Sequence, residues 1–67
     1  MQLHQFLRFV SFGTPILIFD IQGIEICKVR CKDQIDLELY EYPVMEISVG
    51  AINLYKELHG LFITIQK

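Results

Sequence analysis

The fold is decided by residues 14–31, which read TPILIFDIQGIEICKVRC. Residues 16–20 are mostly β-branched, apolar or aromatic, and this composition predicts a β-strand. Residues 20–23 predict a turn, because Gly23 is free to take a positive φ. Apolar residues return in residues 24–30, so the whole stretch predicts a β-hairpin.

The second strand of this hairpin has an imperfect alternation. Ile24 and Ile26 share one face, whereas Cys27 and Val29 share the other. Either both faces of the strand are partly covered, or a β-bulge changes the register.

The rest of the chain predicts one helix and two further strands. Residues 2–10 have apolar side chains at helical spacing, and residues 44–49 and 61–66 have the alternation of strands. Residues 50–60 are either a short helix or a long hairpin connection. The predicted fold is a single α+β domain: a short N-terminal helix packs on a four-stranded, mostly antiparallel sheet, with a short helix or long loop before the last strand.

Residues 32–42 fit two patterns. Ile35, Leu37 and Leu39 alternate with acidic residues, as in a half-buried strand. Ile35, Leu39 and Tyr42 also match the spacing of a helix. We interpret the segment as a loop with a short helical turn.

The composition limits the class of protein. A chain of 67 residues has room for one domain and buries only roughly 60% of its unfolded surface. Its hydrophobic fraction of 52% indicates either a dense β-sheet core or an apolar face used for association. The net charge of −2 argues against direct nucleic-acid binding. Without a secretory signal or an apolar run of about 20 residues, we expect a soluble cytoplasmic protein that does not bind membranes.

Two cysteines and two histidines form a candidate zinc set, because thiolate and imidazole groups suit Zn²⁺. They are His4, Cys27, Cys31 and His59. In a straight strand the two cysteines would be about 13 Å apart, which is too far for one ion or for a disulfide. A shared structural zinc therefore requires a bend after Val29, and the spacing favours two buried thiols and two surface histidines.

Acidic residues follow one another after Lys32 with no intervening base. They are Asp33, Asp36, Glu38, Glu41 and Glu46. Tyr40, Tyr42 and Tyr55 flank this stripe, and tyrosine is enriched at the centres of interfaces. The stripe is either an ordinary solvated face or a surface that docks on the basic groove of a partner.

Enzymatic motifs are absent from the sequence. Ser11 and Ser48 lack the context of a nucleophile elbow, and the four glycines form no phosphate-binding loop. A chain of this size offers little concave pocket for a substrate. We expect a protein that is not an enzyme.

Over nearly its full length the chain resembles a class of very small phage and prophage accessory proteins. The resemblance is carried by Leu3-His4-Gln5-Phe6-Leu7, by Pro-Ile-x-Ile-x-Asp-x-x-Gly-x-Glu-Ile at residues 15–26, by an acidic segment, by Ile47-Ser48-Val49 and by residues 61–65. Some proteins of that size and origin are anti-CRISPR proteins, including inhibitors of the type II effector Cas9, and zinc has a place among them. The resemblance implies a binding role directed at the host.

Two functions from different classes remain. The first is a phage-encoded protein in the host cytoplasm that binds a Cas9-type nuclease and blocks DNA loading. Its partner-binding residues would be Asp33, Asp36, Glu38, Tyr40, Glu41 and Tyr42. The alternative is a homodimeric structural or regulatory module, with or without a stabilising zinc ion.

Overall fold

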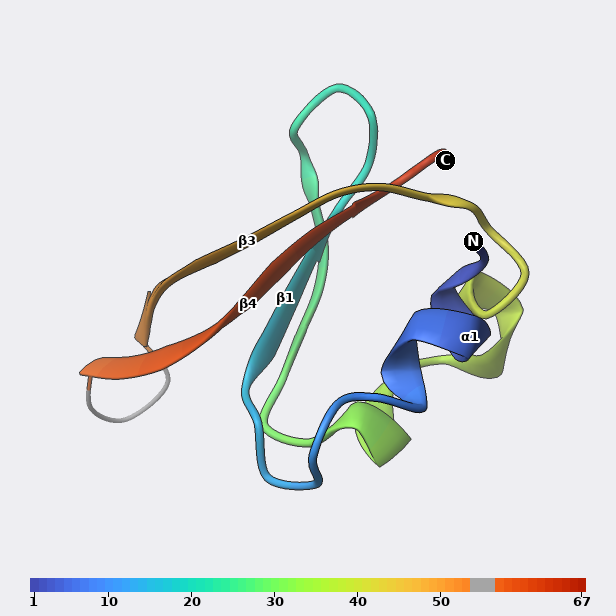
Figure 1. Cartoon of the computed structure of the whole chain (residues 1–67). Coiled ribbons are helices and arrows are strands. Elements are labelled where there is room, and N and C mark those ends of the chain that lie inside the picture. Colours follow the sequence, from blue (N-terminus) through green and yellow to red (C-terminus); the bar gives the residue numbers. More distant parts are fainter. Residues whose placement is uncertain (54–56) are drawn as a thin grey trace.

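The structure, a computed structural model, describes residues 1–53 and 57–67, and the side chains of residues 1–51 and 59–67. It contains one short α-helix, two 3₁₀ helices and four strands (Figure 1). In chain order these are α1 (Leu3–Leu7), β1 (Ile16–Phe19), β2 (Glu25–Val29), η1 (Lys32–Gln34), η2 (Leu37–Leu39), β3 (Val44–Asn53) and β4 (Glu57–Ile65). The predicted α+β class is confirmed.

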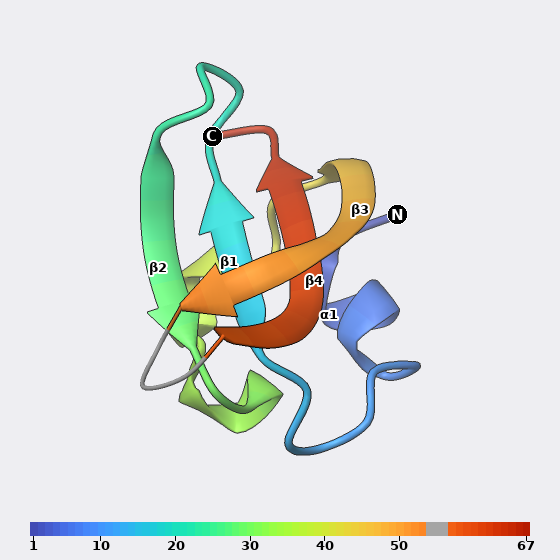
Figure 2. The same ribbon diagram turned by 90° about the vertical axis from the view of Figure 1, so that its left-hand side faces the viewer.

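The strands form one open sheet in the order β2-β1-β4-β3. The pairs β1–β2 and β3–β4 are antiparallel, while β1 and β4 are parallel. The last strand therefore lies between the first strand and β3 (Figure 2). Helix α1 and the two 3₁₀ helices lie on one side of the sheet, and the end of β3 and the start of β4 extend to the other (Figure 1).

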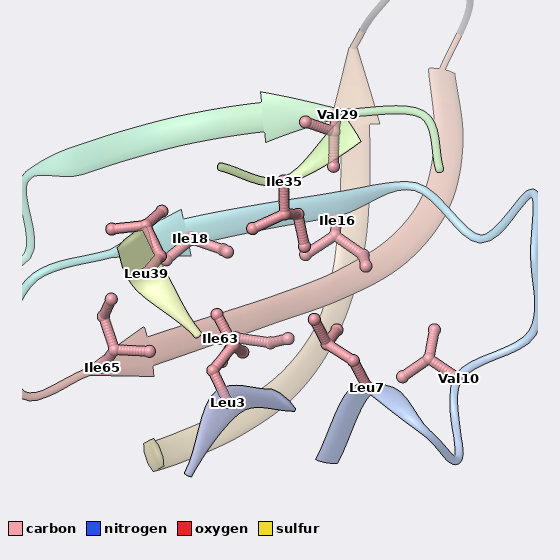
Figure 3. Close-up of a cluster of buried hydrophobic side chains, with 10 residues drawn as sticks. All are labelled: Leu3, Leu7, Val10, Ile16, Ile18, Val29, Ile35, Leu39, Ile63 and Ile65. Carbon is pink, nitrogen blue, oxygen red and sulfur yellow. The ribbon is translucent and has the colours of Figure 1, made fainter. Parts of the chain in front are cut away.

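The core lies between the sheet and the helical side. Its centre consists of fully buried side chains from α1, β1 and β4 (Figure 3). These are Leu3, Ile16, Ile18, Ile63 and Ile65. Each such side chain stabilises the fold by about 1.5–3 kcal/mol relative to leaving it exposed. Leu7, Val10, Val29, Ile35 and Leu39 complete the cluster.

The β1–β2 hairpin forms as predicted, and the bulge alternative is confirmed. Ile18 pairs with Cys27 and Phe19 pairs with Glu25, so the register shifts at that point. Cys27 therefore lies opposite the buried Ile18. In the turn, the Asp20 carboxylate accepts the amides of Gln22 and Ile24, each at 2.9 Å. Gly23 takes a φ of 84°, which few other residues adopt.

The structure differs from the sequence-based expectation over residues 50–60. Instead of a short helix or a long loop, β3 continues to Asn53 and β4 begins at Glu57. Gly50 pairs with Gly60 inside this ladder. Both glycines are therefore internal strand residues.

Residues 32–42 form the two 3₁₀ helices η1 and η2, which confirms the loop with a short helical turn. Within the described part of the chain, no helix has the length and apolar character of a membrane span.

Candidate functional site

Residues 33–42, called the acidic segment from here on, are attached to the core by two apolar side chains. Ile35 and Leu39 are each only 3% exposed, whereas Leu37 is 73% exposed. This pattern follows the helical spacing and not the alternation of a strand. The four carboxylates of the segment are exposed, namely those of Asp33, Asp36, Glu38 and Glu41.

The end of the acidic segment is fixed to α1 by backbone hydrogen bonds. The Leu3 amide donates to the Tyr42 carbonyl at 2.9 Å, and the His4 amide donates to the Tyr40 carbonyl at 3.1 Å. The first amides of a helix have no partner within the helix. The acidic segment supplies those partners, so its backbone position is coupled to the position of α1.

Two of the four carboxylates also make local hydrogen bonds. The Asp36 carboxylate accepts the Glu38 amide at 3.2 Å and so caps η2. The Glu41 carboxylate accepts the side-chain amide of Gln2 at 3.4 Å. These contacts restrain the carboxylates while leaving them exposed to solvent.

The two predicted tyrosines that the structure describes lie at the boundary between core and surface. Tyr40 and Tyr42 are half-buried and pack against the edge of the core. The ammonium of Lys67 lies 5.5 Å from the centre of the Tyr42 ring, which is a cation–π contact. Tyr55 lies outside the described residues. Both described tyrosines therefore stabilise the fold and present a part of the ring at the surface.

A shallow open pocket of about 230 Å³ lies beside the acidic segment. It is lined by His4, Leu7, Arg8, Phe12, Lys32, Asp33 and Tyr40. The Lys32 ammonium donates to the Leu7 carbonyl at 2.9 Å and lies 4.7 Å from the centre of the Phe12 ring. The Leu7 carbonyl also accepts the Val10 amide at 3.1 Å, so it receives two donors just after the end of α1.

The candidate zinc residues occupy different parts of the molecule. Cys27 packs against the core from β2, and the Sγ of Cys31 accepts the Gly13 amide at 3.5 Å. His4 lies in α1 at the pocket, and the exposed His59 pairs with Ala51 at the β3–β4 hairpin. The described residues contain no group of three or more His, Cys, Asp or Glu side chains that could hold a metal ion. Zinc stays a prediction that metal analysis of the purified protein tests.

The environment of Cys27 favours the protonated thiol. Burial raises the pKa of Cys27 above its ordinary value, and the carboxylates of Glu25 and Asp36 raise it further. The thiolate is the form that binds metals and attacks electrophiles. The site therefore disfavours both roles for Cys27 at neutral pH.

Sequence reasoning missed the pocket and the exposed aromatic side chains beside it. Phe9 and Phe12 are both exposed in the segment that joins α1 to β1. Neither residue belongs to the apolar stripe of the predicted helix, so their exclusion from the core was detectable. The contact between Lys32 and the end of α1 could not be detected in the sequence, because it joins distant parts of the chain.

No protein-family model matches this chain, and neither a curated protein nor a solved structure is significantly similar to it.

Proposed function

We propose that this protein is a binding protein that docks its acidic segment on a basic surface of a partner protein. One observation carries the proposal. Four exposed carboxylates lie on a backbone fixed by two buried anchors and by hydrogen bonds to α1. Residues 33–42 contain no lysine or arginine. Their negative charge is therefore presented in a fixed arrangement, so binding does not have to order the segment first.

The carboxylates and the apolar side chains of the acidic segment have different roles in this proposal. An exposed ion pair stabilises a complex by only about 0.2–1 kcal/mol, so charge mainly accelerates association and selects basic partners. Larger contributions come from apolar and aromatic side chains at the centre of an interface. Leu37 is exposed and Tyr40 and Tyr42 are half-buried, so these three side chains of the segment can supply such contacts.

The more specific proposal names the partner as a Cas9-type nuclease in the host of a phage. It rests on the resemblance to small phage accessory proteins, some of which are anti-CRISPR proteins. Nucleases of this type hold nucleic acid in a positively charged channel. An acidic surface that binds at this channel competes with DNA phosphates, and DNA loading is blocked without any catalytic step.

The first experiment measures binding and inhibition. The purified protein is titrated against several purified Cas9 orthologues, and DNA cleavage is assayed with the protein added before the DNA. We expect binding that weakens as salt increases, and inhibition that is lost when DNA is loaded first. A lack of both binding and inhibition across the orthologues would exclude this partner.

The second experiment tests the docking surface. The double variant Asp33→Lys with Glu38→Lys reverses two exposed charges and leaves the cap at Asp36 in place. We expect it to weaken binding by more than about tenfold at low salt. The matched control is the double variant Glu25→Lys with Glu46→Lys, which reverses two exposed charges outside the acidic segment and should bind normally. Equal affinities for the double variant and the control would contradict the proposed surface.

A further inference from the structure

The pocket beside the acidic segment contains two cations with donors to spare. The Arg8 guanidinium and the Lys32 ammonium both line it. The Arg8 side chain has neither a hydrogen bond nor an ion pair with any residue that the structure describes. The Lys32 ammonium has three donors, of which the Leu7 carbonyl accepts one at 2.9 Å. Both cations can therefore donate to an anion that enters the pocket.

Contacts between two distant segments fix one wall of the pocket. The Lys32 ammonium lies 4.7 Å from the centre of the Phe12 ring. At the neighbouring positions along the chain, the Gly13 amide donates to the Sγ of Cys31 at 3.5 Å. Because this wall is formed before a ligand arrives, binding does not have to order it first.

The pocket also has an apolar lining. Leu7 and the half-buried Tyr40 contribute to it, and the Phe12 side chain there is 73% exposed. Covering such a ring with another apolar group removes both surfaces from water. The pocket volume of about 230 Å³ lies below the range of about 300–1,000 Å³ that is typical of drug-sized ligands. The lining therefore fits a ligand with a single ring.

The charges around the pocket select the charge of the ligand. With His4 counted as neutral, Arg8 and Lys32 contribute two positive charges and Asp33 contributes one negative charge. The Nε2 of His4 is already hydrogen-bonded to the Gln2 side-chain oxygen at 3.0 Å. The other carboxylates of the acidic segment do not line the pocket. One net positive charge favours a monoanion, and the Asp33 carboxylate disfavours a phosphate dianion.

We propose that this pocket binds a small monoanion in which one carboxylate is joined to an aromatic ring. Arg8 and Lys32 donate to the carboxylate, because a planar guanidinium matches its two oxygens and an ammonium adds a further donor. The ring of the ligand lies against Phe12 and Tyr40. A free aromatic acid and the C-terminal residue of a peptide share this chemistry. The site does not depend on the docking of the acidic segment.

Binding is measured by titrating the isotope-labelled protein with 3-phenylpropionate and recording its amide chemical shifts. We expect saturable shifts at Arg8, Phe12, Gly13 and Lys32, with a dissociation constant on the order of 1–10 mM for so small an acid. 3-Phenylpropionamide lacks the charge and acetate lacks the ring, so each should bind at least about threefold more weakly. Equal binding of all three, or no saturable shift, would overturn the proposal.

Three variants test the charges of the pocket. Arg8→Gln should raise the dissociation constant at least about threefold, whereas Asp33→Asn should lower it about twofold because a like charge is removed. Lys28→Gln removes an exposed cation from β2 and is the control for Arg8→Gln. Weaker binding by Asp33→Asn, or equal effects of Arg8→Gln and Lys28→Gln, would contradict the site. Asp33→Asn should weaken docking on a basic partner, so the two proposals fail independently.

The source of the carboxylate is distinguished with an acetylated tripeptide that ends in phenylalanine. If the peptide binds more than about threefold tighter than 3-phenylpropionate, the pocket recognises a chain end, and otherwise it recognises a free acid. Either result supports the carboxylate site. The same peptide with a C-terminal amide should bind more weakly, and equal binding of the two peptides would exclude recognition of a chain end.

Discussion

At the scale of single residues, the contact between Gly50 and Phe62 shows why a small residue stands in the middle of a strand. A Cβ atom on Gly50 would lie 2.8 Å from two ring carbons of Phe62. The same ring meets Phe19 edge-on, with 5.9 Å between the ring centres. Phe62 therefore covers the backbone of Gly50 on the face opposite the core, and a larger residue would displace the aromatic pair.

We expect Gly50→Ala to destabilise the protein by about 1–3 kcal/mol, because overpacking outweighs the smaller entropic gain of replacing glycine. Urea denaturation measures the difference. In a Phe62→Leu background the same change should cost less, because the ring is gone and the two changes are coupled. A neutral or stabilising Gly50→Ala variant would show that the ring moves aside freely.

Cys27 predicts a pH dependence of stability. The pKa of the folded thiol lies above its ordinary value of 9.0, so the folded state keeps its proton where the unfolded state has lost it. The stability that the protonated Cys27 thiol contributes is fully present below pH 9.0 and is lost as the pH rises through the pKa of the folded thiol. Thermal melts of Cys27→Ala should therefore show a smaller loss of stability above about pH 9 than the unmodified chain. Cys31→Ala serves as the control, and equal alkaline losses in all three proteins would contradict the assignment.

At the scale of elements, the acidic segment shows how tertiary packing selects between two sequence patterns. Ile35, Leu37 and Leu39 alternate like strand residues, but only Ile35 and Leu39 are buried. The 3₁₀ turns orient these two toward the core and leave Leu37 in solvent. The same turns direct the carboxylates outward, so the packing of the anchors determines the charged surface.

We expect Leu39→Ala to destabilise the protein by about 2–5 kcal/mol, as other deletions of buried leucine side chains do. Leu37→Ala should change stability by less than about 0.5 kcal/mol, as surface substitutions usually do. Equilibrium denaturation compares the two variants. If the segment instead behaved as a half-buried strand, both substitutions would be similarly destabilising.

At the scale of the whole molecule, the two ends of the chain depend on each other. β4 pairs with β1 on one side and with β3 on the other, and it supplies the buried Ile63 and Ile65. Without it, the β1–β2 hairpin and β3 would have no common sheet. Isolated hairpins are at best marginally stable in water.

A chain that lacks residues 61–67 should therefore lose cooperative unfolding and the dispersion of its amide resonances. Circular dichroism during heating and a two-dimensional NMR spectrum measure these properties. Removal of Lys67 alone is the control, because it leaves every sheet pair in place. It removes the contact with Tyr42 and the hydrogen bond from the Lys67 amide to the Ile65 carbonyl. Cooperative melting of the longer truncation would contradict the central role of β4.

The four exposed carboxylates of the candidate site were identified from the sequence, because charged residues without a buried partner remain in solvent. The pocket beside them could not be identified from the sequence, because α1, the loop at Phe12 and Lys32 come from separate parts of the chain. The described residues contain no group of three or more His, Cys, Asp or Glu side chains that could hold a metal ion, and zinc stays a prediction: residue types predict ligand chemistry, but only tertiary packing places ligands together.

The sequence by itself determined the β1–β2 hairpin, its turn at Gly23, the amphipathic α1 and the strand character of β3 and β4. These features follow from local periodicity and turn residues, which act over a few positions. Only the tertiary structure decided that β4 lies beside β1 in parallel, that β3 is the terminal strand of the sheet, and that Ile35 and Leu39 anchor the acidic segment. Those outcomes depend on pairing between distant segments, where the burial of apolar surface outweighs local preference.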